Sequence, residues 1–196
     1  MNIKKISVLC LTLLALQGCV PILLGGAVVA ATATYVVMND HRSPSTKRTD
    51  TLLQKTIEQK LNADTAFKQK CHLIVSVFRG TVLLTGQCPN NNLKLQAQRI
   101  AASASGISQL YNEINIEAPN SSLTRMSDDW ISTKIRFALH KISFLQSAEY
   151  QIVTENGVVY VMGKMTQPQA KALVNAVRDV DGVQKVVKMI SLVTSS

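Results

Sequence analysis

The sequence predicts an α+β protein of two small domains in tandem, each with the order α-β-β-α-β and a three-stranded mixed sheet covered by two helices. Three observations predict this fold. The chain from about residue 47 onward contains one hydrophobic pattern twice. In each copy, a two-residue turn ending in glycine separates two short apolar runs. A helical pattern precedes and follows each of these hairpins.

Each copy begins with an amphipathic helix whose apolar residues are spaced four apart. The opening helix of the second copy, expected over residues 128–142, repeats the opening helix of the first copy with an offset of 78 residues. Asp128 and Asp129 would lie in its first turn, where acidic side chains complement the helix N-terminus. The apolar positions are Leu53, Ile57 and Leu61 in the first copy and Ile131, Ile135 and Leu139 in the second.

A hairpin follows each helix. Arg79-Gly80 joins strands 73–78 and 81–86, and Asn156-Gly157 joins strands 150–155 and 158–163. Asn-Gly is the stronger signal, because both central residues of a type I′ turn need positive φ. Second helices are expected over 93–104 and 168–180, closed by Gly106 and Gly182, with last strands over 109–116 and 185–193. We therefore place the domains at 47–118 and 127–194, with a linker over 119–126.

The N-terminus has the features of an export signal. A positive start with Lys4 and Lys5 precedes the apolar run from Ile6 to Leu16. The motif Leu16-Gln17-Gly18-Cys19 resembles the lipobox of bacterial lipoproteins, which implies that residues 1–18 are removed and that Cys19 is acylated. An ordinary signal peptide or an uncleaved membrane helix is the alternative.

Residues 19–46 are expected to form a flexible tether. The stretch from Val20 to Met38 carries no charge and is long enough to span a bilayer, which is its alternative interpretation. Residues 39–50 are polar and have a composition that does not favour packing. About thirty residues would then separate the lipid from the first folded element.

The repeat resembles a known family. The stretches Asp129–Arg136, Thr154–Gly157, Val161–Gly163, Leu83–Gln87 and Tyr111–Ile114 are similar to BON domains. Two such domains behind a lipobox are typical of dual BON-domain lipoproteins. The resemblance implies a lipid-anchored outer-membrane protein that faces the periplasm, binds anionic phospholipid through its second domain and supports envelope integrity. Val20 and Pro21 agree with this destination, because many lipoproteins retained in the inner membrane have Asp after the acylated cysteine.

The charge favours an anionic partner. Loss of Lys4 and Lys5 with the signal lowers the net charge from +9 to +7. Export makes nucleic acid an unsuitable partner, and no basic tract with interleaved aromatic residues is present. Anionic lipid is the better candidate.

The first helix of the second copy carries a candidate membrane face. Trp130, Lys134, Phe137 and Lys141 form a stripe about 110° from the apolar stripe, which must face the sheet. Aromatic rings interleaved with lysines suit the headgroup region of a bilayer. The alternative is that Trp130 and Phe137 pack against a loop or the other domain. The first copy lacks this face, since its corresponding residues are Leu52, Thr56, Gln59 and Ala63.

Two cysteines remain outside the signal and the lipidation site. A two-residue turn at Arg79-Gly80 places Cys71 directly opposite Cys88 in a non-hydrogen-bonded pair, where side chains lie closest. A disulfide is expected in an oxidising compartment, and two reduced core thiols are the alternative. No spacing matches a catalytic, metal-binding or cofactor-binding motif, so we expect no enzyme, no metal and no cofactor.

Two functions remain possible. The first is a structural lipoprotein that binds anionic phospholipid through the Trp130 face. The second is an adaptor that docks an outer-membrane or periplasmic assembly protein, either through the same helix face or through the outer faces of the sheets. Those outer faces are predicted to carry Ile74, Phe78 and Leu83 in the first domain and Val153, Tyr160 and Met162 in the second.

Overall fold

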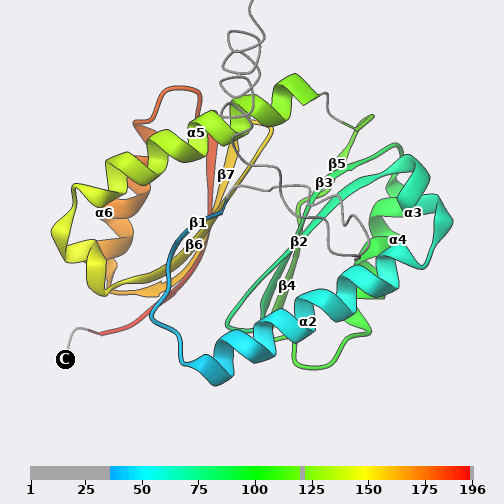
Figure 1. Ribbon diagram of the computed structural model, residues 1–196, viewed down its shortest axis with the longest axis horizontal. Helices are drawn as coiled ribbons and strands as arrows, with labels where there is room; N and C mark the ends of the chain where they lie inside the picture. The colour runs from blue at the N-terminus through cyan, green and yellow to red at the C-terminus, as the bar shows by residue number, and fades with distance from the viewer. Residues whose placement is uncertain (1–35, 120–121, 195–196) are drawn as a thin grey trace, which may run out of the picture. The chain divides into compact units, whose positions relative to one another are not determined.

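The computed structural model describes residues 36–119 and 122–194. The signal, Cys19 and most of the predicted tether lie outside the described residues. The first domain contains α2 (Pro44–Asn62), α3 (Thr65–Lys70), β2 (His72–Phe78), β3 (Thr81–Cys88), α4 (Asn91–Ala102), β4 (Gln109–Asn112) and β5 (Asn115–Ile116). The second contains α5 (Ser122–His140), the 3₁₀ helix η2 (Ser143–Ser147), β6 (Glu149–Glu155), β7 (Val158–Met165), α6 (Gln167–Arg178) and β8 (Lys185–Leu192). The predicted class, tandem α+β domains with mixed sheets, is confirmed (Figure 1).

Both sheets combine an antiparallel hairpin with a parallel third strand. In the first domain, β2 pairs with β3, and β3 runs parallel to β4 and then to β5, so the predicted last strand is present in two pieces. In the second domain, β6 pairs with β7, and β7 runs parallel to β8. The helix α3, which the sequence did not predict, has Asp64 as its N-cap, whose carboxylate accepts a hydrogen bond from the Ala66 amide at 2.8 Å.

The second sheet has four strands rather than the predicted three. Its additional strand is β1 (Val36–Asn39), which pairs antiparallel with β6 at the sheet edge. The expectation that residues up to 46 form a flexible tether is therefore wrong for residues 36–46. Arg42 is buried, and α2 begins at Pro44 behind the N-cap Ser43. Sixteen residues, 20–35, rather than about thirty lie between Cys19 and β1, the first element that the structure describes.

The alternative of a membrane span over 20–38 falls mostly outside the described residues, and its last three residues belong to β1. Among the helices that the structure describes, none is both long and apolar enough to cross a bilayer.

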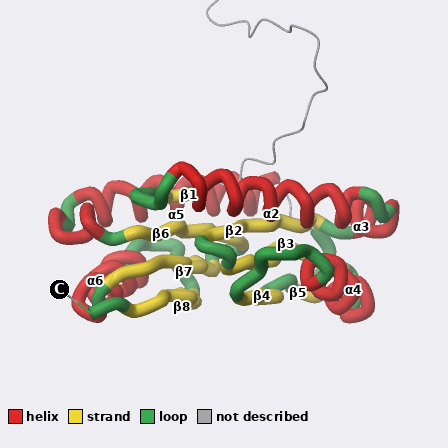
Figure 2. The backbone as a smooth tube through the Cα atoms, turned by 90° about the horizontal axis from the view of Figure 1, so that it is seen from below, coloured by secondary structure: helices red, strands yellow, loops and turns green. Residues whose placement is uncertain are grey.

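The predicted helix stripes form the two cores. The residues spaced four apart are buried against the inner face of each sheet, together with alternate residues of the strands. Both predicted turns have the expected backbone, with positive φ at Arg79, Gly80, Asn156 and Gly157. Figure 2 shows α2 and α5 along one edge and α4 and α6 along the other, with the strands between them.

A buried aspartate joins the first helix of each domain to its hairpin turn. The Asp128 carboxylate accepts hydrogen bonds from the backbone amides of Asn156 at 2.7 Å and Gly157 at 2.9 Å. Asp50 binds the amides of Arg79 and Gly80 in the same way, at 2.8 and 2.9 Å. The prediction that Asp128 is a first-turn charge is wrong, because α5 begins six residues earlier and the side chain points to the turn.

The outer faces of the two sheets pack against each other. Phe78 and Leu83 of the first domain form one buried cluster with Val153, Tyr160, Met162 and Met189 of the second. Polar contacts cross the same interface, with Gln87 donating to Glu155 and Arg79 donating to Glu149 at 2.6 Å. The hypothesis that these sheet faces dock an assembly partner is therefore wrong, since the two faces cover each other.

Removal of the Asp128 carboxylate tests how much this contact stabilises the fold. We expect Asp128→Ala to lower the free energy of unfolding by about 3 kcal/mol, because two turn amides lose their acceptor. Asp129→Ala is the matched control. Burial and the neighbouring Asp128 raise the pKa of the Asp129 carboxyl, so its removal should leave stability unchanged or slightly higher. Urea unfolding measures both variants, and equal losses in the two would contradict this role.

Candidate membrane-binding face

The candidate face lies along α5, away from the core. Ile131, Ile135 and Leu139 occupy the buried side of this helix. The Trp130 and Phe137 side chains are 63% and 67% exposed, respectively. The alternative that they pack against the other domain is not what the structure shows. Large apolar side chains in water are costly unless a partner covers them, so these two rings need an explanation.

Two further exposed apolar residues lie before and after the predicted stripe in the sequence. Met126, one turn before Trp130, and Phe144 in η2 are both exposed. Sequence reasoning missed them because the helix was expected to begin at 128 and because the turn after it had no predicted structure. The spacing of four from Met126 to Trp130 was nevertheless a usable signal. We use the name α5 face for Met126, Trp130, Lys134, Phe137 and Lys141.

The two lysines of the α5 face differ. Lys134 is half-buried, and its ammonium group donates a hydrogen bond to the backbone carbonyl of Asp181, in the loop after α6. Lys141 is exposed and has no hydrogen bond or ion pair with any residue that the structure describes. Lys134 therefore has a structural role in addition to its charge, whereas the ammonium group of Lys141 is exposed to solvent.

The first domain offers an internal comparison. Leu52, the counterpart of Trp130, is 57% exposed. Lys60 donates to the Ser103 carbonyl at 3.2 Å, a contact similar to that between Lys134 and Asp181. A pocket of about 340 Å³, lined in part by Leu52, Thr56 and Ser105, lies beside this helix. The backbone arrangement is thus shared, but the aromatic rings are confined to the second domain.

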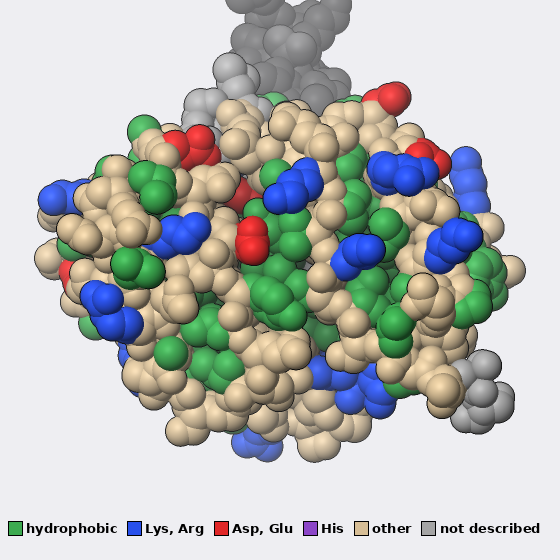
Figure 3. Space-filling model, turned by 180° about the vertical axis from the view of Figure 1, so that it is seen from behind, with side chains coloured by type: hydrophobic (Ala, Val, Ile, Leu, Met, Phe, Trp, Pro, Cys, Tyr) green, Lys and Arg blue, Asp and Glu red, His purple; other side chains and the backbone are tan. Residues whose placement is uncertain are grey.

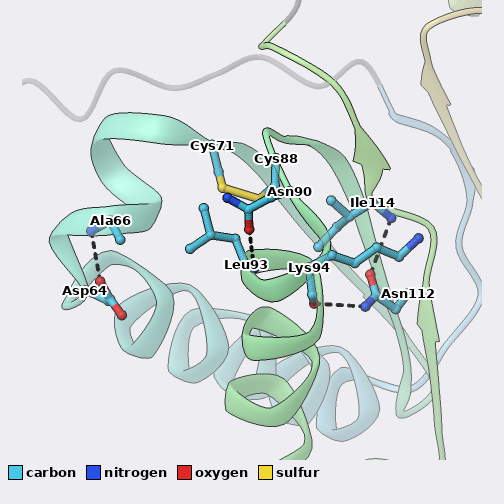
Figure 4. The surroundings of a disulfide bond; sticks show 9 residues. All are labelled: Asp64, Ala66, Cys71, Cys88, Asn90, Leu93, Lys94, Asn112 and Ile114. Carbon is cyan, nitrogen blue, oxygen red and sulfur yellow. Dashed lines mark hydrogen bonds between the residues drawn. A yellow bond between two sulfur atoms is a disulfide. The ribbon is translucent and has the colours of Figure 1, made fainter.

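Cys71 and Cys88 form a disulfide at the end of the first hairpin. Their Cα atoms are 4.5 Å apart, the spacing of a non-hydrogen-bonded pair. The bond lies beside the start of α4, where the Asn90 side chain accepts from the Leu93 amide at 3.0 Å (Figure 4). A crosslink that closes a loop as long as that between Cys71 and Cys88 typically stabilises a fold by about 3 kcal/mol. It therefore ties the two hairpin strands together where the chain turns into α4.

Residues 36–119 and 122–194 contain no group of three side chains that could hold a metal ion. The buried Glu155 carboxyl, whose pKa burial raises, lies between the domains and accepts a hydrogen bond from Gln87. Among the described residues, the α5 face is the candidate site that both the sequence pattern and the exposure of its rings indicate.

Comparison with known proteins identifies the family. The family model described as BON domain matches residues 49–118 and 127–194. The chain belongs to the BON-domain family. The predicted tandem of two such domains is confirmed.

Two relatives match over most of the chain. Outer membrane lipoprotein DolP from Haemophilus influenzae is 31% identical over 188 residues, which covers 95% of each chain. A protein named 21 kDa hemolysin from Actinobacillus pleuropneumoniae is 34% identical over 154 residues and 79% of each chain. The predicted likeness to a dual BON-domain outer-membrane lipoprotein is confirmed by the first of these.

A solved structure gives a weaker likeness. The C-terminal domain of CdsD, a structural protein of the type III secretion system of Chlamydia trachomatis, is 10% identical. The match covers 72% of this chain and 98% of that one, with a TM-score of 0.30, which is too low for any inference.

Proposed function

We propose that this protein is a lipid-anchored, periplasm-facing lipoprotein of the outer membrane that binds anionic phospholipid through the α5 face and supports envelope integrity. The observation that carries the proposal is the exposure of Trp130 and Phe137 on the second domain, beside the free ammonium group of Lys141. Aromatic rings are favoured at the headgroup level of a bilayer, and lysines pair there with phosphate. The role is binding rather than catalysis.

The positive charge of the protein is not confined to α5. Lys and Arg side chains are spread over the face in Figure 3, among hydrophobic and polar ones. Such a surface attracts anionic membranes in general, and salt screens this attraction. Salt dependence alone therefore does not locate the contact, and variants of α5 are needed.

Flotation with anionic liposomes tests the α5 face. We expect Trp130→Ala and Lys141→Glu to weaken binding of the unlipidated chain, the second most strongly at low salt, because each removes a contact to the headgroup region. Thermal stability should change little, in contrast with Ile135→Ala, where loss of a buried side chain costs roughly 2–5 kcal/mol.

Leu52→Ala is the matched control for Trp130→Ala, since Leu52 holds the same place in the first domain and is similarly exposed. It should bind anionic liposomes like the parent. A folded Trp130→Ala variant with parental binding would refute the α5 face as the lipid contact. If that variant instead lost an outer-membrane or periplasmic protein in pull-down experiments, the adaptor function would take its place.

Acylation of Cys19 is a separate part of the proposal. The lipobox and the likeness to an outer-membrane lipoprotein support it. Cys19→Ala should abolish the incorporation of a radiolabelled fatty acid and leave the signal attached, because the thiol that accepts the lipid is missing. Continued labelling of this variant would show that Cys19 is not the acylated residue.

A further inference from the structure

The segment between the anchor and the first domain contacts both domains. The backbone of β1 pairs with β6 of the second domain over four residues, from Val36 opposite Val153 to Asn39 opposite Tyr150. The side-chain amide of Asn39 then donates to three backbone carbonyls around η2, those of Leu145, Gln146 and Ala148, at 3.1, 2.9 and 2.7 Å. The end of this strand is therefore attached to the second domain by specific hydrogen bonds.

Three residues later, the chain is held by the first domain. The Arg42 guanidinium donates to both carboxylate oxygens of Asp40, at 2.8 and 3.0 Å, and also to Asp50 of α2. It lies 4.5 Å from the centre of the Phe78 ring. Only 6% of the Arg42 side chain is exposed. An arginine this well paired and stacked is difficult to displace, because the buried Asp50 carboxylate would lose a cation that balances its charge.

The contacts of Arg42 lead directly to the interface between the sheets. Phe78 belongs to the apolar cluster shared by the two domains. Asp50, which Arg42 also binds, holds the turn of Arg79, and Arg79 pairs with Glu149 at the start of β6. The Arg42 hydrogen bond holds the pKa of Asp40 at about 2, so this carboxylate is ionised throughout the physiological pH range. The ionic network thus runs from β1 through the first domain and back to β6.

We propose that residues 36–42 form a clasp that holds the two sheets face to face and makes the second domain the place where the anchored chain enters the fold. The clasp makes the chain enter the fold at the domain that carries the α5 face, since β1 lies beside α5. Residues 20–35 span about 55 Å when fully extended. This part of the inference rests on acylation of Cys19, whereas the clasp itself does not depend on lipid.

Amide hydrogen exchange of the mature chain carrying Cys19→Ser tests the clasp without any membrane. We expect the β1 amides that donate to β6 to be protected in the parent, and Arg42→Ala to accelerate their exchange at least tenfold. Arg48→Ala is the matched control, because it removes the same charge from an exposed position of α2. Unprotected β1 amides in the parent, or equal exchange in the two variants, would overturn the proposal.

A second variant covers the case in which Arg42→Ala fails to fold. Met38 and Gln151 are opposite each other in the β1–β6 register. We expect Met38→Cys combined with Gln151→Cys to form a second disulfide under mild oxidation, while Met38→Cys combined with exposed Gln109→Cys should not. Absence of the first crosslink in a folded protein would overturn the clasp. Neither readout uses lipid, so failure of the clasp and failure of membrane binding are distinguishable.

Discussion

The buried aspartate at the start of each domain is the contact on which the geometry of both repeats depends. Asp50 and Asp128 each accept hydrogen bonds from two backbone amides of the hairpin turn, so one carboxylate fixes the helix against the strands. Removing a buried carboxylate that accepts hydrogen bonds from amides lowers the stability of the fold, because the amides are left without an acceptor. In α5, this contact sets the rotation of the helix about its axis. Ile135 consequently faces the core, and Trp130 and Phe137 face outward.

The two repeats use this shared framework differently. In the first domain, Asp50 also binds Arg42 and so connects α2 to the segment that leads toward the anchor. In the second domain, the residue 78 positions after Arg42 is Asn120 rather than an arginine, and the exposed side of α5 has aromatic rings at the positions of Leu52 and Gln59. The first repeat is therefore suited to holding the domains together and the second to contacting a surface. The sheets pack through their outer faces, which leaves the helices outward.

Local signals in the sequence predicted most of the fold. The four-residue spacing of apolar positions, the two turns and the pairing of Cys71 with Cys88 depend on neighbours within one hairpin or one helix, and all of them are present. The exposure of Trp130 also followed from helix periodicity.

Contacts between distant residues were not predictable in this way. β1 is four residues long, too short to show a pattern of its own. Its partner β6 lies more than one hundred residues away in the sequence. Arg42 was read as a tether residue because its partners Asp50 and Phe78 come together only in the folded chain. The apolar outer face of a sheet has the same pattern whether another domain or a separate partner covers it. From the sequence, docking of a separate partner on this face is therefore one alternative hypothesis, whereas the structure covers the face with the second sheet.

Fluorescence of Trp130 gives the most direct measurement of the central claim, that the α5 face enters the headgroup region of anionic membranes. Trp130 is the only tryptophan in the chain, so its emission reports on this one position. With vesicles that contain phosphatidylglycerol and a lipid-attached quencher, the account predicts a blue shift and strong quenching, neither of which occurs with vesicles of phosphatidylcholine alone. Protein that floats with the anionic vesicles while its Trp130 emission stays unshifted and unquenched would contradict the account, because the membrane would then be bound by another surface.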